Sequence, residues 1–156
     1  MIDRSEPHSV TTVQSLSEWE SILEEIDRAG YFGLNFVAAG PDPLSHKIQR
    51  IFLALPNAPG NSSVYMADIA DRPVIMERVL SDLAGMLENG RITKVLYDSK
   101  SILSFIRAIA GRKLNFCRIF DLMLASQICW SGYYYLTPSG NPKNPWKKRL
   151  FAISCG

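Results

Sequence analysis

The order of apolar patterns along the chain is the feature that most constrains its fold. Three strand patterns follow one another between residues 31 and 67 and are separated by turn-rich links, which favour antiparallel neighbours. After residue 73, helical repeats alternate with short apolar runs, an order typical of parallel strands with helices packed on them. The sequence therefore predicts an α/β fold with a mixed sheet, an antiparallel meander plus parallel strands, covered by helices.

The expected strands lie at residues 8–13, 31–37, 47–55, 63–67, 93–97 and 115–120. Helices are expected from a capping box formed by Ser17 and Glu20 up to Gly30, from Pro73 to about Asn89, at 99–110, and at 121–129 with Asp121 as the N-cap. Residues 131–156 show neither periodicity. We therefore expect one domain at 1–130 followed by an irregular aromatic and basic arm at 131–156.

Length and composition narrow the class of protein. The chain has 156 residues, a length typical of one domain. No apolar run approaches the roughly 20 residues of a membrane span, and the N-terminus lacks the apolar stretch of a signal peptide. Three widely spaced cysteines without a CxxC pair indicate free thiols. We expect a cytoplasmic protein without membrane contact.

Charge is unevenly distributed along the chain. Residues 1–90 carry a net charge of −7 and residues 91–156 a net charge of +9. A basic half indicates attraction to an anionic partner, whereas folding that interleaves the two halves would dilute it.

Three segments resemble motifs of the DEDD 3′–5′ exonucleases, the superfamily of ribonuclease D and of the proofreading domain of family A DNA polymerases. Residues 33–44 (GLNFVAAGPDPL) resemble the first motif, a strand that ends in Asp-Thr-Glu-Thr before a turn. Residues 94–105 resemble the second, a strand followed by a helix that carries a catalytic Asp. Residues 120–127 resemble a Phe-Asp-Thr-Met-Leu-Ala helix. The resemblance spans about Ser9 to Trp130 and implies a ribonuclease H-like fold, truncated at the C-terminus.

The catalytic positions of this family are altered in the chain. The resemblance implies two divalent ions, about 4 Å apart, held by carboxylates. The aligned positions carry Asn35, Val37 and Ile102, and no acidic residue follows Asp121. Valine and isoleucine offer no oxygen ligand. The expected site is therefore degenerate, without catalytic residues, metal or other cofactor, and the domain is expected to be an inactive exonuclease-like protein.

Two alternatives stay open. With a shifted register, Asp42 and Asp98 are the fallback metal ligands of an active, Mg²⁺- or Mn²⁺-dependent 3′–5′ exonuclease with unconventional ligands. In the second alternative, the chain is a structural or assembly protein without nucleic-acid contact.

Cations and aromatics suggest how nucleic acid would be bound. Single strands bind surfaces on which bases stack and phosphates meet cations. The candidates for binding single-stranded DNA or RNA are Lys100, Lys143, Trp146, Lys147, Lys148 and Arg149. In the alternative interpretation, the aromatics cover the sheet and the cations are only solvated. Because a truncated domain exposes apolar surface, we also expect a homodimer.

Overall fold

The computed structural model describes residues 10–58, 61–70, 72–130, 135–136 and 142–143. The chain divides into two compact units, Met1–Leu122 and Met123–Gly156. The division falls at the start of the last helix. The expected domain boundary after residue 130 stays a prediction. No helix among the described residues is long and apolar enough to cross a membrane.

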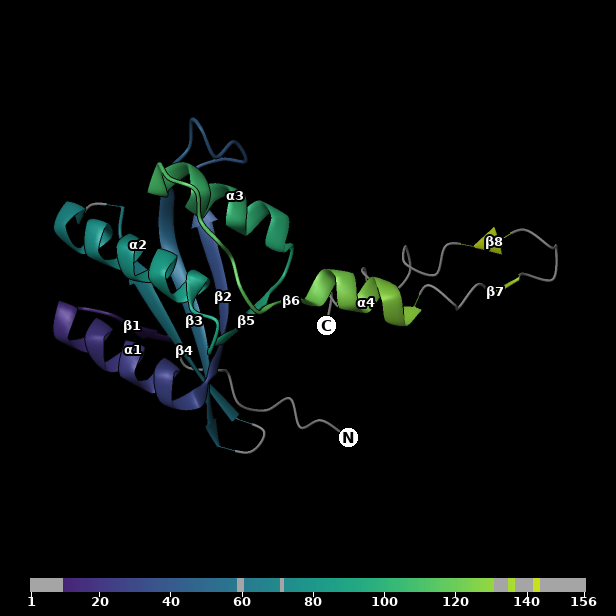
Figure 1. Ribbon diagram of the computed structural model, residues 1–156, viewed down its shortest axis with the longest axis horizontal. Coiled ribbons are helices and arrows are strands. Elements are labelled where there is room, and N and C mark those ends of the chain that lie inside the picture. Colours follow the sequence, from purple (N-terminus) through teal and green to yellow (C-terminus); the bar gives the residue numbers. More distant parts are fainter. Residues whose placement is uncertain (1–9, 59–60, 71, 131–134, 137–141, 144–156) are drawn as a thin grey trace. The chain divides into compact units, whose positions relative to one another are not determined.

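The first unit is built on one mixed sheet in the strand order β1-β4-β3-β2-β5-β6 (Figure 1). Its strands are β1 (Val10–Thr12), β2 (Tyr31–Ala38), β3 (Ile48–Ala58), β4 (Asn61–Asp68), β5 (Thr93–Leu96) and β6 (Ile119–Asp121). β2, β3 and β4 form the antiparallel meander, while β1, β5 and β6 pair in parallel with their neighbours. The predicted mixed sheet is confirmed.

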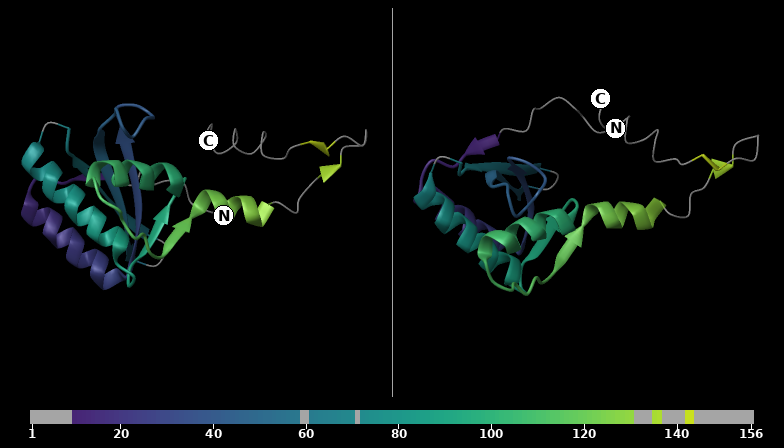
Figure 2. Two further views of the ribbon diagram at one scale, coloured as in Figure 1. Left: turned by 45° about the horizontal axis from the view of Figure 1, so that its top comes forward. Right: turned by 90° about the horizontal axis from the view of Figure 1, so that it is seen from above.

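Three helices, α1 (Leu16–Ala29), α2 (Pro73–Glu88) and α3 (Ser99–Ala110), lie on one face of this sheet (Figures 1 and 2). Because side chains alternate along a strand, Phe32, Leu34 and Phe36 of β2 point toward the helices. The first two are buried, and the ring of Phe36 meets that of Phe105 in α3 at 5.0 Å between centroids. The core therefore lies between the helical layer and this face.

The opposite face carries an apolar row that crosses every strand. Pairing register aligns Val10, Val64, Ala54, Gly33, Val95 and Phe120. The two ends of the row are half exposed, at 49% for both Val10 and Phe120. We refer to this side of the sheet as the open face.

The second unit contains most of α4 (Leu122–Trp130) and a pair of short antiparallel strands, β7 (Tyr135–Leu136) and β8 (Pro142–Lys143). These strands belong to the segment expected to be irregular. The remaining residues of that segment lie outside the described part of the chain. Cys117 and Cys129 are free thiols, as expected.

The predicted cap of α1 is wrong by two residues. The N-cap is Ser15, whose Oγ accepts a hydrogen bond from the backbone N–H of Glu18 at 3.2 Å. Glu18 in turn accepts one from the backbone N–H of Gln14. The predicted C-cap at Gly30 is confirmed, since its backbone is left-handed with φ 74°.

A buried lysine joins the loops at the amino-terminal ends of β5 and β6. The Lys94 side chain has 0% exposure. Its Nζ donates to three backbone carbonyls, those of Asn89 at 2.6 Å, Ile92 at 2.9 Å and Cys117 at 2.9 Å. Burial lowers the pKa of this ammonium group. The contacts fasten the loop after α2 to the loop before β6.

Glu88, at the end of α2, makes a second link to the same loop. Its carboxylate accepts hydrogen bonds from Nη1 and Nη2 of Arg112, the latter at 2.7 Å, and from the backbone N–H of Asn115. The hydrogen bonds from Arg112, followed by the bond from Asn115, lower the pKa of the Glu88 carboxyl below its ordinary value.

Glu88→Gln is expected to lower the melting temperature at neutral pH, because an amide cannot accept the paired guanidinium bonds as a charge does. A lowered folded-state pKa gives stability that is present above the unfolded value of 4.5 and is lost as pH falls through the folded value. The difference from the parent protein should therefore shrink below pH 4.5. Thermal melts across this range test it, with the exposed Glu24→Gln as control. A pH-independent difference would contradict the role of the charge.

Candidate functional site at the carboxyl edge of the sheet

The carboxyl ends of β2 and β5 meet at one edge of the sheet. The two strands run parallel, and Leu34 pairs with Leu96. Beyond β5, Asp98 adopts a left-handed backbone with φ 56° and caps α3, its Oδ1 accepting from the backbone N–H of Ser101. α3 therefore starts beside the end of β2, which is where the motif resemblance places the catalytic positions.

Asn35 and Val37 lie at this edge on the open face. Asn35 is exposed, and its Oδ1 accepts a hydrogen bond from the backbone N–H of Phe36 at 2.8 Å. Val37 is 44% exposed. This part of the strand therefore offers one neutral oxygen, already hydrogen-bonded, and no charge.

Ile102 is in a different environment. Its side chain is only 4% exposed and belongs, with Phe105 and Ile106, to the buried side of α3. The position that aligns with a catalytic aspartate is thus part of the apolar core. Asn35 and Val37 thus lie on the open face of the sheet, whereas Ile102 lies on the helical side and is closed to water.

The fallback ligands Asp42 and Asp98 both accept hydrogen bonds from backbone N–H groups close to them in the chain. Asp98 caps α3, as described above. Asp42 organises the turn after β2, accepting from the Ser45 hydroxyl and from the backbone N–H of Leu44. These two hydrogen bonds, that from Ser45 the more strongly, lower the pKa of the Asp42 carboxyl.

Asp121 contributes to this edge in a way that the sequence did not indicate. It pairs with Leu96 in the sheet register, and its Oδ2 accepts from the backbone N–H of Ser99 at 2.7 Å. The carboxylate thus satisfies the first N–H of α3. The sequence signals it only as an acidic residue directly after an apolar strand, a position that predicts the cap of the following helix.

These donors do not fit a pair of divalent ions. Hard cations take anionic and carbonyl oxygens. Of the three aligned positions, one supplies an amide and two supply hydrocarbon. Among the described residues, no group of three or more His, Cys, Asp or Glu side chains lies close enough together to hold a metal ion.

The candidate nucleic-acid residues are placed only in part. Lys100 is exposed in the first turn of α3, at the carboxyl edge. Lys143 lies in β8. Trp146, Lys147, Lys148 and Arg149 lie outside the described residues, so their role stays a prediction.

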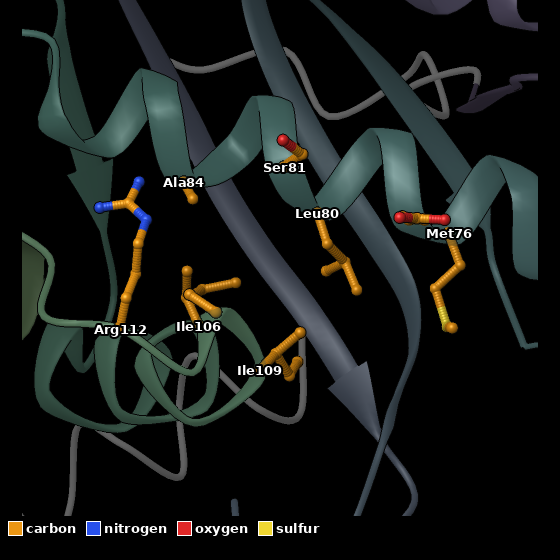
Figure 3. Close-up of a pocket in the computed structure, with 9 residues that line it drawn as sticks. Met76, Leu80, Ser81, Ala84, Ile106, Ile109 and Arg112 are labelled. Carbon is orange, nitrogen blue, oxygen red and sulfur yellow. The ribbon is translucent and has the colours of Figure 1, made fainter.

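A hollow of about 500 Å³ lies in the helical layer rather than at the carboxyl edge. Figure 3 shows Met76 and Leu80 of α2 facing Ile106 and Ile109 of α3 across it, with Arg112 at one end. Its lining is mainly apolar, and nothing in it resembles the chemistry of phosphodiester cleavage.

Solved structures share this fold. The EXO domain of Aedes aegypti Nibbler matches over 92% of this chain and 65% of its own, with a TM-score of 0.60 and 18% identity. Trypanosoma brucei RNase D in complex with RNA U12 matches over 92% and 46%, with a TM-score of 0.64 and 14% identity. Escherichia coli RNase D matches over 78% and 29%, with a TM-score of 0.57 and 14% identity.

The chain has the fold of the DEDD 3′–5′ exonuclease domains. It spans less than two thirds of the length of the three structures just compared. No protein-family model and no curated protein matches the sequence. The likeness to exonuclease domains therefore lies in the fold of the backbone.

Proposed function

We propose that this chain is a catalytically inactive domain on a 3′–5′ exonuclease fold that binds single-stranded nucleic acid without cleaving it. The observation that carries the proposal is the burial of Ile102 in the apolar core at the position of a catalytic aspartate. A metal-bridged phosphodiester needs charge at that position, and the core provides none. Val37 on β2 removes a second carboxylate, and Asn35 replaces another by a neutral amide.

Binding is supported by what structures of the same fold contain. The Trypanosoma brucei RNase D structure holds RNA U12, and a Brucella melitensis NrnC structure, with a TM-score of 0.52, holds pGG. Affinity for a single strand depends mainly on cations and stacking surfaces, which are separate from the metal ligands. Loss of the carboxylates therefore removes cleavage and one source of repulsion for phosphate. The homodimer and the cytoplasmic location stay predictions.

The nuclease assay is expected to be negative. A 5′-labelled oligonucleotide incubated with the full chain and Mg²⁺ or Mn²⁺ should keep its length. Any shortening should be no faster with metal than in EDTA. Gel resolution of single nucleotides provides the measurement. Metal-dependent 3′ trimming that disappears in Asp42→Asn with Asp98→Asn would instead establish the active exonuclease with unconventional ligands. Asparagine suits this comparison because it retains the turn at residue 42 and the cap at residue 98.

A further inference from the structure

The edge of the sheet opposite the degenerate site is formed by two loops, residues 89–92 and 111–118. Hydrogen bonds hold the second loop to the first loop and to the end of α2. The backbone N–H of Cys117 donates to the carbonyl of Leu87 at 3.1 Å, and the Arg118 guanidinium donates to the carbonyl of Gly90 at 3.4 Å. Lys94 adds its three carbonyl contacts beneath them. We call this the amino edge, since β5 and β6 begin there.

Exposed cations gather on the amino edge. Arg91, Arg112, Lys113 and Arg118 are all exposed. The carboxylate of Glu88, which contacts the second loop, is paired with Arg112. Within the described part of the chain, no ion pair engages the other three cations. Three positive charges are therefore presented to solvent from hydrogen-bonded loops.

Arg107 and Arg112 have local roles and do not count toward this surface. Arg107, in the last turn of α3, lies 5.2 Å from the ring centre of Phe116. Arg112 follows the C-terminus of the same helix, where the helix dipole favours cations. Neither argument applies to Arg91 and Lys113, which lie in loops. The Arg118 guanidinium donates to the carbonyl of Gly90 but has no ion-pair partner among the described residues.

The structure also shows where the positively charged residues of the second half of the sequence lie. Lys94 is buried, so it adds nothing to an exposed surface. Lys100 lies at the carboxyl edge, whereas Arg91, Lys113 and Arg118 share the amino edge. Folding therefore concentrates part of the excess instead of dispersing it among acidic side chains.

We propose that the amino edge binds the phosphate backbone of single-stranded nucleic acid through Arg91, Lys113 and Arg118. This deepens the proposed function and rests on it. Guanidinium groups match phosphate oxygens in geometry, and contacts to phosphate give affinity that depends on salt more than on base sequence. Because the loops are already hydrogen-bonded in place, little ordering entropy opposes binding.

The test compares two triple variants of the full chain that lose the same charge. The amino-edge variant combines Arg91→Gln, Lys113→Gln and Arg118→Asn. Asparagine is used at residue 118 because the backbone there is left-handed, with φ 50°, a conformation that asparagine tolerates. The matched control combines Lys47→Gln, Arg50→Gln and Arg72→Gln, three exposed cations near the carboxyl edge.

Binding is measured by fluorescence anisotropy with labelled oligo-U and oligo-dT of about 16 nucleotides, at several salt concentrations. The parent protein and the control should bind alike. The amino-edge variant should bind at least about tenfold more weakly at low salt, and its slope of log K against log salt should be shallower by about 2, since three phosphate contacts are lost. Circular dichroism melts verify that both variants fold.

The other outcomes separate the two proposals. Equal binding by the amino-edge variant and the parent would overturn the location and leave the proposed function standing, and loss in the control alone would move the surface to the carboxyl edge. No binding by the parent at low salt would overturn both. Binding to poly-glutamate but not to oligonucleotide would assign the edge to an acidic protein and overturn the choice of nucleic acid.

Discussion

Ile102→Asp is expected to lower the free energy of unfolding by about 5 kcal/mol at neutral pH. The substitution removes most of a buried aliphatic side chain, which costs about 2–5 kcal/mol when isoleucine is shortened to alanine, and places an unpaired charge where water does not reach. Small domains have total stabilities of about 5–15 kcal/mol, so much of the protein should unfold. Urea denaturation followed by circular dichroism measures the change.

Two companion variants separate the contributions. Ser101→Asp places the same carboxylate one residue away, at an exposed position in the first turn of α3, where the helix dipole favours it. It should be neutral or slightly stabilising. Ile102→Ala should cost less than Ile102→Asp at neutral pH, because it leaves a cavity without a charge.

The pH dependence of Ile102→Asp has a definite sign. Burial raises the folded-state pKa of an introduced carboxyl above its unfolded value, so stability is lost as pH rises through that interval and recovers as pH falls. The difference between Ile102→Asp and Ile102→Ala should thus narrow in acid. If Ile102→Asp were as stable as Ser101→Asp, the position would be open to water or to a cation, and the assignment of an inactive site would lose its main support.

Periodicity was enough to predict the sheet because burial on one face imposes an alternation that the sequence displays directly. The cap of α1 was harder to place, since Ser-x-x-Glu occurs twice in succession, at Ser15 and at Ser17. Both serines satisfy the local rule for a capping box. Which one begins the helix depends on where Trp19 must lie to be buried, and that is a property of the tertiary packing.

The sequence predicts those properties of the candidate site that depend only on the type of each side chain. The motif resemblance places Asn35, Val37 and Ile102 at carboxylate positions, an expectation that rests on the sequence alone, and the chemistry of these side chains argues against metal binding. The burial of Ile102 could not be read in the same way. The contacts of Asp121 with Ser99 and of Lys94 with Cys117 were missed because each joins residues more than 20 positions apart along the chain. Local patterns contain no information on such contacts.

Lys94→Met is expected to lower the free energy of unfolding by about 3 kcal/mol. Methionine matches the length of the lysine stem but cannot donate to the carbonyls of Asn89, Ile92 and Cys117, and hydrogen bonds to charged groups contribute about 1.5–3 kcal/mol each before the cost of burying the charge is deducted. Lys113→Met, an exposed lysine on the neighbouring loop, serves as the control and should change stability by less than about 0.5 kcal/mol.

The pH dependence of this difference tests whether Lys94 is responsible. Its folded-state pKa lies below the unfolded value of 10.5, so between these values the unfolded chain holds more protons than the folded one. The parent protein therefore gains stability as pH rises through that window, and Lys94→Met does not. The difference between them should widen toward pH 10.5. A Lys94→Met protein as stable as the parent would mean that burying the ammonium costs as much as its three carbonyl bonds return. The loops of the amino edge would then be held by Glu88, by the Arg118 side chain and by the backbone contacts.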